Sequence, residues 1–249
     1  MEQETVAVAW CDSGDVDGKF AQGLVDVLLK SGIKFETSLR SQGNQIGRQR
    51  ETILKYWYEN NLSDWLLWVD SDVVISPETF KLLWDNKDAK ERPVMTGVYF
   101  TTDTPEEPLM IPAPTIFKFA EDGDVVGIKR IHPLPKNELI QVDAAGMGFV
   151  LMHRSVVDKV LEKMPNATFF TEVGVHKTFM GEDIFFFALI SQAGIPVWCH
   201  TSAVVPHMKR FSFDVHYYNA FFGGVEKKQE KKIIIPKNAG KLITPGRKG

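Results

Sequence analysis

A run of apolar residues that ends in two aspartates constrains this chain more than any other feature. Trp65–Val69 contains only apolar side chains, which is typical of a strand buried on both faces of a sheet. Asp70-Ser71-Asp72 follows directly, and in an extended chain Asp70 and Asp72 project to the same side. Two carboxylates side by side repel each other unless a cation lies between them. The stretch therefore predicts a site for Mg²⁺ or Mn²⁺, which typically also holds substrate phosphates.

Apolar strands and helices alternate through the first hundred residues. The expected elements are a strand at 6–10, a helix at 20–29, a strand at 34–39, a helix at 45–60, the strand at 65–69, a helix that opens at Ser76-Pro77, and a strand at 94–100. Such alternation is typical of βαβ units, which build a parallel sheet. From residue 101 the pattern is irregular and proline-rich, with hairpin strands expected at 115–119 and 125–130 and a further strand at 140–142.

These elements predict an α/β fold. We expect a single Rossmann-like domain over residues 1–210, with a mostly parallel central sheet flanked by helices, and a C-terminal lid and tail over 211–249. Ligands of open α/β sheets bind beyond the carboxyl ends of the strands. Trp10-Cys11-Asp12 and Asp70-Ser71-Asp72 follow or end two expected strands, so we expect them to line one cleft.

Charge and cysteine use narrow the classes of function. A net charge of −3 argues against a general nucleic-acid binder. No apolar run approaches the ~18 residues that span a bilayer, and the acidic start lacks the pattern of a signal peptide. Cys11 and Cys199 lack metal-ligand spacing, which favours a reduced setting while one disulfide stays open. We therefore expect a soluble, cytoplasmic protein.

Basic residues gather at the C-terminus. Residues 226–249 hold eight Lys or Arg and two Glu, a net of about +6. Two interpretations stay open: a solvated, partly disordered end, or a basic flap over an anionic ligand or a membrane surface.

Three short motifs follow one another along the chain. They are Asp70-Ser71-Asp72 after its strand, Gly146-Met147-Gly148 before an apolar run, and Gly181-Glu182-Asp183 at the start of an apolar helix. In this order they resemble the DxD, glycine-rich and (G/x)ED motifs of GT-A-type glycosyltransferases, which use nucleotide-sugars. The resemblance covers about residues 5–210. An acidic triplet alone is common, whereas the three motifs in order on an α/β pattern are considerably more specific.

The resemblance implies a set of metal ligands. Asp72 is expected as a direct ligand of Mn²⁺ or Mg²⁺, with Asp70 at the metal through water or at the ribose. His207 falls where many members supply a third ligand, and neutral imidazole suits Mn²⁺. His200 is the competing candidate, and a structural role for the histidine stays open. For the aspartates the alternative is a solvated loop or a helix cap, although Ser76 is better placed as the cap.

Glu182 and Asp183 are the expected catalytic residues. Resemblance to inverting members selects Asp183 as the general base that deprotonates an acceptor hydroxyl, with Glu182 orienting acceptor or donor hydroxyls. Carboxylates at this position are also stabilised by the positive end of the helix dipole, so a role limited to helix capping stays open. In retaining members the equivalent acid is not such a base, so the stereochemical outcome is not fixed.

A further group of residues is expected to bind the donor nucleotide. Two arginines, Arg48 and Arg50, lie near the start of a helix. The similar segment of related transferases places an arginine at the nucleotide about twenty residues before the DxD motif, and Arg50 matches that spacing best. A guanidinium there is expected to pair with phosphate or with the base. The other expected donor contacts are Trp10, Cys11, Asp12, Asp70, Ser71, Gly146 and Gly148. The alternatives are a solvated helix face for the arginines, a core position for Trp10, and relief of crowding for the glycines.

The expected function is transfer of a sugar from a UDP- or GDP-sugar to a hydroxyl of a carbohydrate or other acceptor. The aromatic segment at 211–218 is a candidate lid over bound donor. One alternative is a nucleotidyltransferase, against which the acidic loop at 11–18 weighs, and another is a non-catalytic nucleotide- or carbohydrate-binding module. The donor sugar, the acceptor and the oligomeric state are not predicted.

Overall fold

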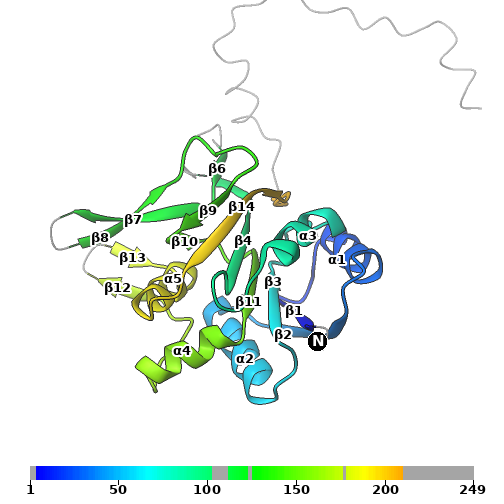
Figure 1. Cartoon of the computed structure of the whole chain (residues 1–249), viewed down its shortest axis with the longest axis horizontal. Coiled ribbons are helices and arrows are strands. Elements are labelled where there is room, and N and C mark those ends of the chain that lie inside the picture. Colours follow the sequence, from blue (N-terminus) through cyan, green and yellow to red (C-terminus); the bar gives the residue numbers. More distant parts are fainter. Residues whose placement is uncertain (1–3, 103–111, 123–124, 176–177, 210–249) are drawn as a thin grey trace, which may run out of the picture. The chain divides into compact units, whose positions relative to one another are not determined.

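The computed structural model describes residues 4–102, 112–122, 125–175 and 178–209 (Figure 1). Its main element is a sheet of seven strands in the order β2-β1-β3-β11-β4-β14-β9. The strands are β1 (Val6–Asp12), β2 (Phe35–Gln42), β3 (Trp65–Val69), β4 (Val94–Val98), β9 (Leu139–Val142), β11 (Phe149–His153) and β14 (Val197–Val204).

Five of these strands run in one direction. β1 pairs in parallel with β2 and β3, and β4 pairs in parallel with β14. β11 lies antiparallel between β3 and β4, and β9 is antiparallel to β14 at one edge. The predicted α/β fold with a mostly parallel central sheet flanked by helices is confirmed.

Helices cover both faces of the sheet (Figure 1). Two of them, α1 (Gly18–Lys30) and α3 (Pro77–Asn86), pack on one face, where Phe20 and Phe80 join Val6 and Val8 of β1 in one apolar cluster. The opposite face carries α2 (Ile46–Glu59), α4 (Ser155–Lys163) and α5 (Glu182–Gln192), whose apolar side chains cluster with Ala7. Because alternate residues of a strand point to opposite faces, one apolar run serves both clusters.

The helix after β3 begins where the sequence predicts. Ser76 Oγ accepts a hydrogen bond from Thr79 N at 3.2 Å, and Thr79 Oγ1 accepts one from Ser76 N at 3.0 Å. This reciprocal capping, with Pro77 in the first turn, confirms Ser76 as the cap. Helix capping of α3 is therefore not the role of Asp70 or Asp72.

The irregular, proline-rich region and the segment before α5 form smaller sheets. β5 (Phe100–Thr102) pairs with β6 (Pro112–Pro114), β7 (Ile116–Asp122) pairs with β8 (Val125–Arg130) and β10 (Ala144–Ala145), and β12 (Val173–Val175) pairs with β13 (Thr178–Met180). The expected hairpin at 115–130 is confirmed. The expected strand at 94–100 is interrupted, because the chain leaves the main sheet after Val98 and pairs with β6 from Phe100 onward.

No helix in the described ranges is long and apolar enough to cross a membrane. The predicted lid and basic tail, residues 211–249, lie outside the described residues, and the domain division at residue 210 stays a prediction.

Candidate functional site

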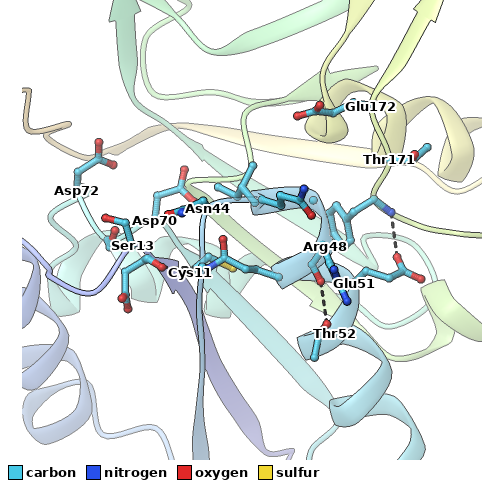
Figure 2. Close-up of a pocket in the computed structure, with 18 of the residues that line it drawn as sticks. Cys11, Ser13, Asn44, Arg48, Glu51, Thr52, Asp70, Asp72, Thr171 and Glu172 are labelled. Atoms are coloured by element: carbon cyan, nitrogen blue, oxygen red, sulfur yellow. Dashed lines mark hydrogen bonds between the residues drawn. The ribbon is translucent and has the colours of Figure 1, made fainter.

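A cleft of about 1180 Å³ opens at the carboxyl ends of β1 and β3. Figure 2 shows Cys11, Ser13, Asp70 and Asp72 on one side, Thr171 and Glu172 on the other, and Arg48, Glu51 and Thr52 of α2 between them. The cleft therefore lies where the α/β fold places ligands, and both strand ends that were expected to share a cleft contribute to it.

At the end of β1 the carboxylate of Asp12 is already engaged. Arg40 Nε and Nη2 donate to its two oxygens at 2.6 and 2.8 Å, and Gly14 N donates at 2.9 Å. The hydrogen bonds from Arg40 hold the pKa of Asp12 below its ordinary value. Asp12 thus lines the cleft and ties β1 to β2, with its acceptor oxygens occupied.

Trp10 and Cys11 point to opposite faces of the sheet. The Trp10 ring packs against Phe20, with ring centroids 5.9 Å apart, on the side of α1. Cys11 is on the other side, lines the cleft and is buried, and burial raises the pKa of its thiol to about 12. Cys11 and Cys199 are both free thiols, so the structure contains no disulfide between them.

The two aspartates of the motif point to different partners. Val73 N donates to Asp70 O at 2.9 Å, so the chain turns directly after β3. Both aspartates line the cleft, as expected, but the chain does not stay extended through Asp72, and the two carboxylates have different partners.

Asp70 is bound by a buried arginine. Arg50 of α2 donates from Nη2 to Asp70 Oδ1 at 2.6 Å and from Nη1 to Glu182 Oε1 at 2.5 Å, and its side chain is only 4 % exposed. Burial opposes the charge of Arg50, but the two carboxylates outweigh it and raise its pKa above the usual range. Arg50 joins the end of β3 to the start of α5.

Arg48 is placed differently from Arg50. It is exposed in the first turn of α2 and lines the cleft, as does Ser71. Of the two arginines expected at the nucleotide, Arg48 is therefore the one whose guanidinium is open to a ligand.

Asp72 faces His207 and Lys209. His207 Nε2 lies 3.1 Å and Lys209 Nζ 2.8 Å from Asp72 Oδ2. Burial opposes ionisation of Asp72, yet the hydrogen bonds from His207 and Lys209 lower its pKa to about 2. The segment that follows β14 is fixed by its backbone, because Met208 N donates to Asp72 O at 2.7 Å.

The histidine ring is oriented by a backbone carbonyl. His207 Nδ1 lies 2.9 Å from Phe100 O, and since a carbonyl only accepts, Nδ1 is the donor. Nε2 then donates to Asp72 when the ring is protonated, and carries a lone pair that faces the carboxylate oxygen when the ring is neutral. Two lone pairs repel unless a proton or a cation lies between them, and a carbonyl-bound Nδ1 is the usual arrangement of a metal-ligating histidine.

Asp72 and His207 therefore fit a Mn²⁺ or Mg²⁺ ion as a pair of ligands. Among the described residues no group of three or more His, Cys, Asp or Glu is arranged to hold a metal, since Asp70 is turned to Arg50. Magnesium is commonly held by one or two protein ligands with water and substrate phosphates. His200 lies within β14, where its Nδ1 accepts from Ser202 N at 3.3 Å.

Glu182 and Asp183 form the first turn of α5. Burial raises the pKa of both carboxyl groups above their ordinary values. Glu182 is held by Arg50, and Asp183 Oδ1 accepts from Ile184 N at 2.7 Å. A carboxylate whose pKa is raised takes a proton more readily, which suits a general base.

The two glycines of the middle motif make room for a tyrosine. A Cβ at Gly146 would lie 2.0 Å from Tyr99 Oη, and one at Gly148 would lie 2.9 Å from the Tyr99 ring. The Tyr99 ring in turn meets the His207 ring edge-on, with centroids 4.9 Å apart. Neither glycine is among the residues that line the cleft; both lie against Tyr99, and Gly148 O also accepts a hydrogen bond from Asp70 N at 3.1 Å.

Among the residues at the site that were not predicted, three make contacts with the predicted ones. Tyr99 carries no local pattern that marks it. Lys209 stands two residues after His207, the spacing that places side chains on one side of an extended segment. Gln49 ties two strand ends together, because its Nε2 donates to Asp12 O at 3.0 Å and to Ser41 O at 2.6 Å.

No protein-family model and no curated sequence matches this chain. Its structure is similar to A197 from STIV, with a TM-score of 0.51 and 19 % identity over 83 % of this chain and 86 % of that chain. At this identity the likeness shows a shared fold alone.

Two further solved structures give a TM-score of 0.46, which is too low to support a conclusion about this chain. GalNAc-T7 with UDP, GalNAc and Mn²⁺ is 11 % identical over 84 % of this chain and 44 % of that chain. CMP:2-keto-3-deoxy-manno-octonic acid synthetase complexed with CTP is 15 % identical over 82 % and 90 %.

Proposed function

We propose that this protein is a metal-dependent glycosyltransferase that moves a sugar from a UDP- or GDP-sugar to an acceptor hydroxyl. The observation that carries the proposal is the pairing of Asp72 with His207 at the cleft. Two segments far apart in sequence bring a carboxylate and a carbonyl-oriented imidazole within 3.1 Å. Such a pair has the chemistry of a divalent-cation site, and its place beyond β3 suits a nucleotide diphosphate.

The donor occupies the cleft in this proposal. A divalent cation, when bound, offsets the charge of the departing nucleoside diphosphate. Asp72 and His207 hold that cation, while Ser71 and Arg48 line the same cleft and are available to the nucleotide. Arg48 suits phosphate because a guanidinium donates two parallel hydrogen bonds.

The acceptor reacts beside α5. Its hydroxyl oxygen forms a bond to the anomeric carbon as the bond from that carbon to the diphosphate oxygen breaks, and the hydroxyl proton passes to Asp183. Burial raises the pKa of Asp183, which favours this proton transfer. Glu182, fixed by Arg50, orients the reacting hydroxyls. This assignment corresponds to inversion at the anomeric carbon.

The test is a thermal-shift screen of UDP, GDP, UDP-sugars, GDP-sugars, UTP and CTP, with Mn²⁺ and with EDTA. We expect a nucleoside diphosphate or its sugar to stabilise the protein in Mn²⁺ and to lose most of this effect in Asp72→Asn. If no diphosphate raises the melting temperature with any metal, the proposal fails. Stabilisation by triphosphates alone favours a nucleotidyltransferase instead.

A second measurement separates an enzyme from a binding module. With the ligand found by the screen, turnover is measured as release of nucleoside diphosphate from the matching nucleotide-sugar in Mn²⁺. Slow hydrolysis that an acceptor accelerates supports a transferase. Binding without any release of diphosphate, with or without acceptors, supports a non-catalytic module.

A further inference from the structure

Lys209 places a positive charge on the oxygen where the proposed cation belongs. Its Nζ lies 2.8 Å from Asp72 Oδ2, the same oxygen that His207 Nε2 approaches at 3.1 Å. All three residues line the cleft, and the Lys209 side chain is 58 % exposed. The ammonium is therefore held at the carboxylate by charge and is free to leave it.

We propose that Lys209 competes with the divalent cation for Asp72 and, once displaced, binds the diphosphate of the donor. An ammonium and a divalent cation beside one carboxylate repel each other, so binding of one weakens binding of the other. This inference rests on the proposed function, because the diphosphate is the ligand that receives the displaced ammonium.

The chemistry of lysine suits both positions. A lysine ammonium is a compact charge on a flexible stem, so it turns from a carboxylate to a nearby phosphate without movement of the backbone. That backbone is anchored, since the neighbouring Met208 N donates to Asp72 O at 2.7 Å. In the absence of a cation Lys209 neutralises Asp72, and in its presence Lys209 adds a second positive charge at the phosphates.

The first arm of the test measures Mn²⁺ alone. Free Mn²⁺ is titrated by electron paramagnetic resonance against the full chain, in the wild type and in Lys209→Met, Lys209→Arg and Lys30→Met. Lys30 is the matched control, because it is 65 % exposed and pairs with Asp26 at 2.7 Å on α1. We expect Lys209→Met to bind Mn²⁺ about three- to fivefold more tightly, the range of an exposed ion pair, and the other two variants to match the wild type.

The second arm measures UDP and GDP by calorimetry at saturating Mn²⁺. We expect Lys209→Met to weaken binding of the preferred diphosphate about tenfold, as for loss of one hydrogen bond between charged groups, and Lys209→Arg to retain it. Unchanged Mn²⁺ affinity in Lys209→Met overturns the competition, and unchanged diphosphate affinity overturns the second role. If the wild type binds neither diphosphate, the proposed function fails, while the Mn²⁺ arm still decides whether Lys209 competes for Asp72.

Discussion

The two aspartates of one motif belong to regions with opposite character. Asp70 belongs to a closed cluster, in which a buried arginine, Arg50, is shared with Glu182. Asp72 belongs to an open cluster at the cleft, in which it meets His207 and an exposed lysine, Lys209. Both clusters neutralise a carboxylate with a cation from the chain, but only the cation of the open cluster is free to leave.

The two aspartates of the motif therefore lie in different electrostatic surroundings. In the closed cluster a guanidinium with two carboxylates replaces the water that each charge would otherwise need, so removal of one partner leaves buried charges unpaired. In the open cluster solvent screens the charges, so a partner can be exchanged at small cost. The closed cluster links the end of β3 to the start of α5, and in the proposed function the open cluster binds what enters the cleft.

Loss of the buried guanidinium should have the largest effect on stability. Arg50→Met leaves Asp70 and Glu182 without their shared cation, and we expect it to lower the free energy of unfolding by about 3–5 kcal/mol. Arg48→Met, two residues earlier and exposed, is the control and should stay within about 0.5 kcal/mol. Urea unfolding measures both variants. Equal costs for the two would show that the closed cluster has no structural role.

Asp183, the proposed general base, should affect the rate of transfer and not the binding of nucleotide. Asp183→Asn is expected to lower the rate of sugar transfer about 10²–10⁴-fold and to leave nucleotide affinity unchanged, because the lost group only accepts a proton. The wild-type rate should rise with pH through a pKa above the ordinary 3.8 of aspartate, since burial raises it. This acid limb should vanish in the variant. Transfer at the wild-type rate by Asp183→Asn would contradict the assignment.

Stability of that variant follows from the same pKa. A carboxyl group whose pKa is raised by folding binds its proton more tightly in the folded state, so its contribution to stability falls as pH rises from 3.8 through the raised value. At pH 7 Asp183→Asn should therefore unfold at no lower urea concentration than the wild type. A marked loss of stability would mean that Asp183 is mainly structural.

The next prediction concerns the packing of Tyr99, which contacts His207 and both glycines of the middle motif. Gly146→Ala would place a Cβ 2.0 Å from Tyr99 Oη, and we expect overpacking of about 1–3 kcal/mol. Tyr99→Phe removes the hydroxyl that the new Cβ would overlap, so the double variant should recover part of the lost stability. Urea unfolding of the four proteins gives the coupling free energy. Additive effects would contradict the contact.

Most of the fold could be predicted from the sequence, and so could part of the difference in burial between Arg48 and Arg50. Arg50, Ile53, Leu54 and Trp57 stand at i, i+3, i+4 and i+7, the spacing of one helix face, and all four are buried. Arg48 falls outside that face and is exposed. The helical pattern therefore holds the signal that separates the two arginines, although spacing to the DxD motif alone favoured Arg50 for the nucleotide.

Other features depend on contacts between segments that are distant in sequence, and no local sequence pattern predicts such contacts. Asp72 and His207 meet because the segment after β14 returns beside the turn after β3, and a sequence does not state which distant segments pair. The glycines of the middle motif were visible, but the ring of Tyr99 that fills the space beside them was not. The turn after β3, and the different partners that it gives Asp70 and Asp72, were likewise not visible in the sequence.

The smallest expected effect lies in the open cluster. Asp72→Asn removes one carboxylate from His207 and Lys209, and since its side chain is 38 % exposed, solvent screening should limit the cost to about 1 kcal/mol or less in EDTA. The same variant should lose most of its Mn²⁺ affinity, because a carboxylate is replaced by a neutral amide. Urea unfolding and Mn²⁺ titration are compared directly. A stability loss as large as that of Arg50→Met would erase the distinction between the two clusters, whereas a small loss with weakened metal binding would assign structure to Asp70 and ligand binding to Asp72.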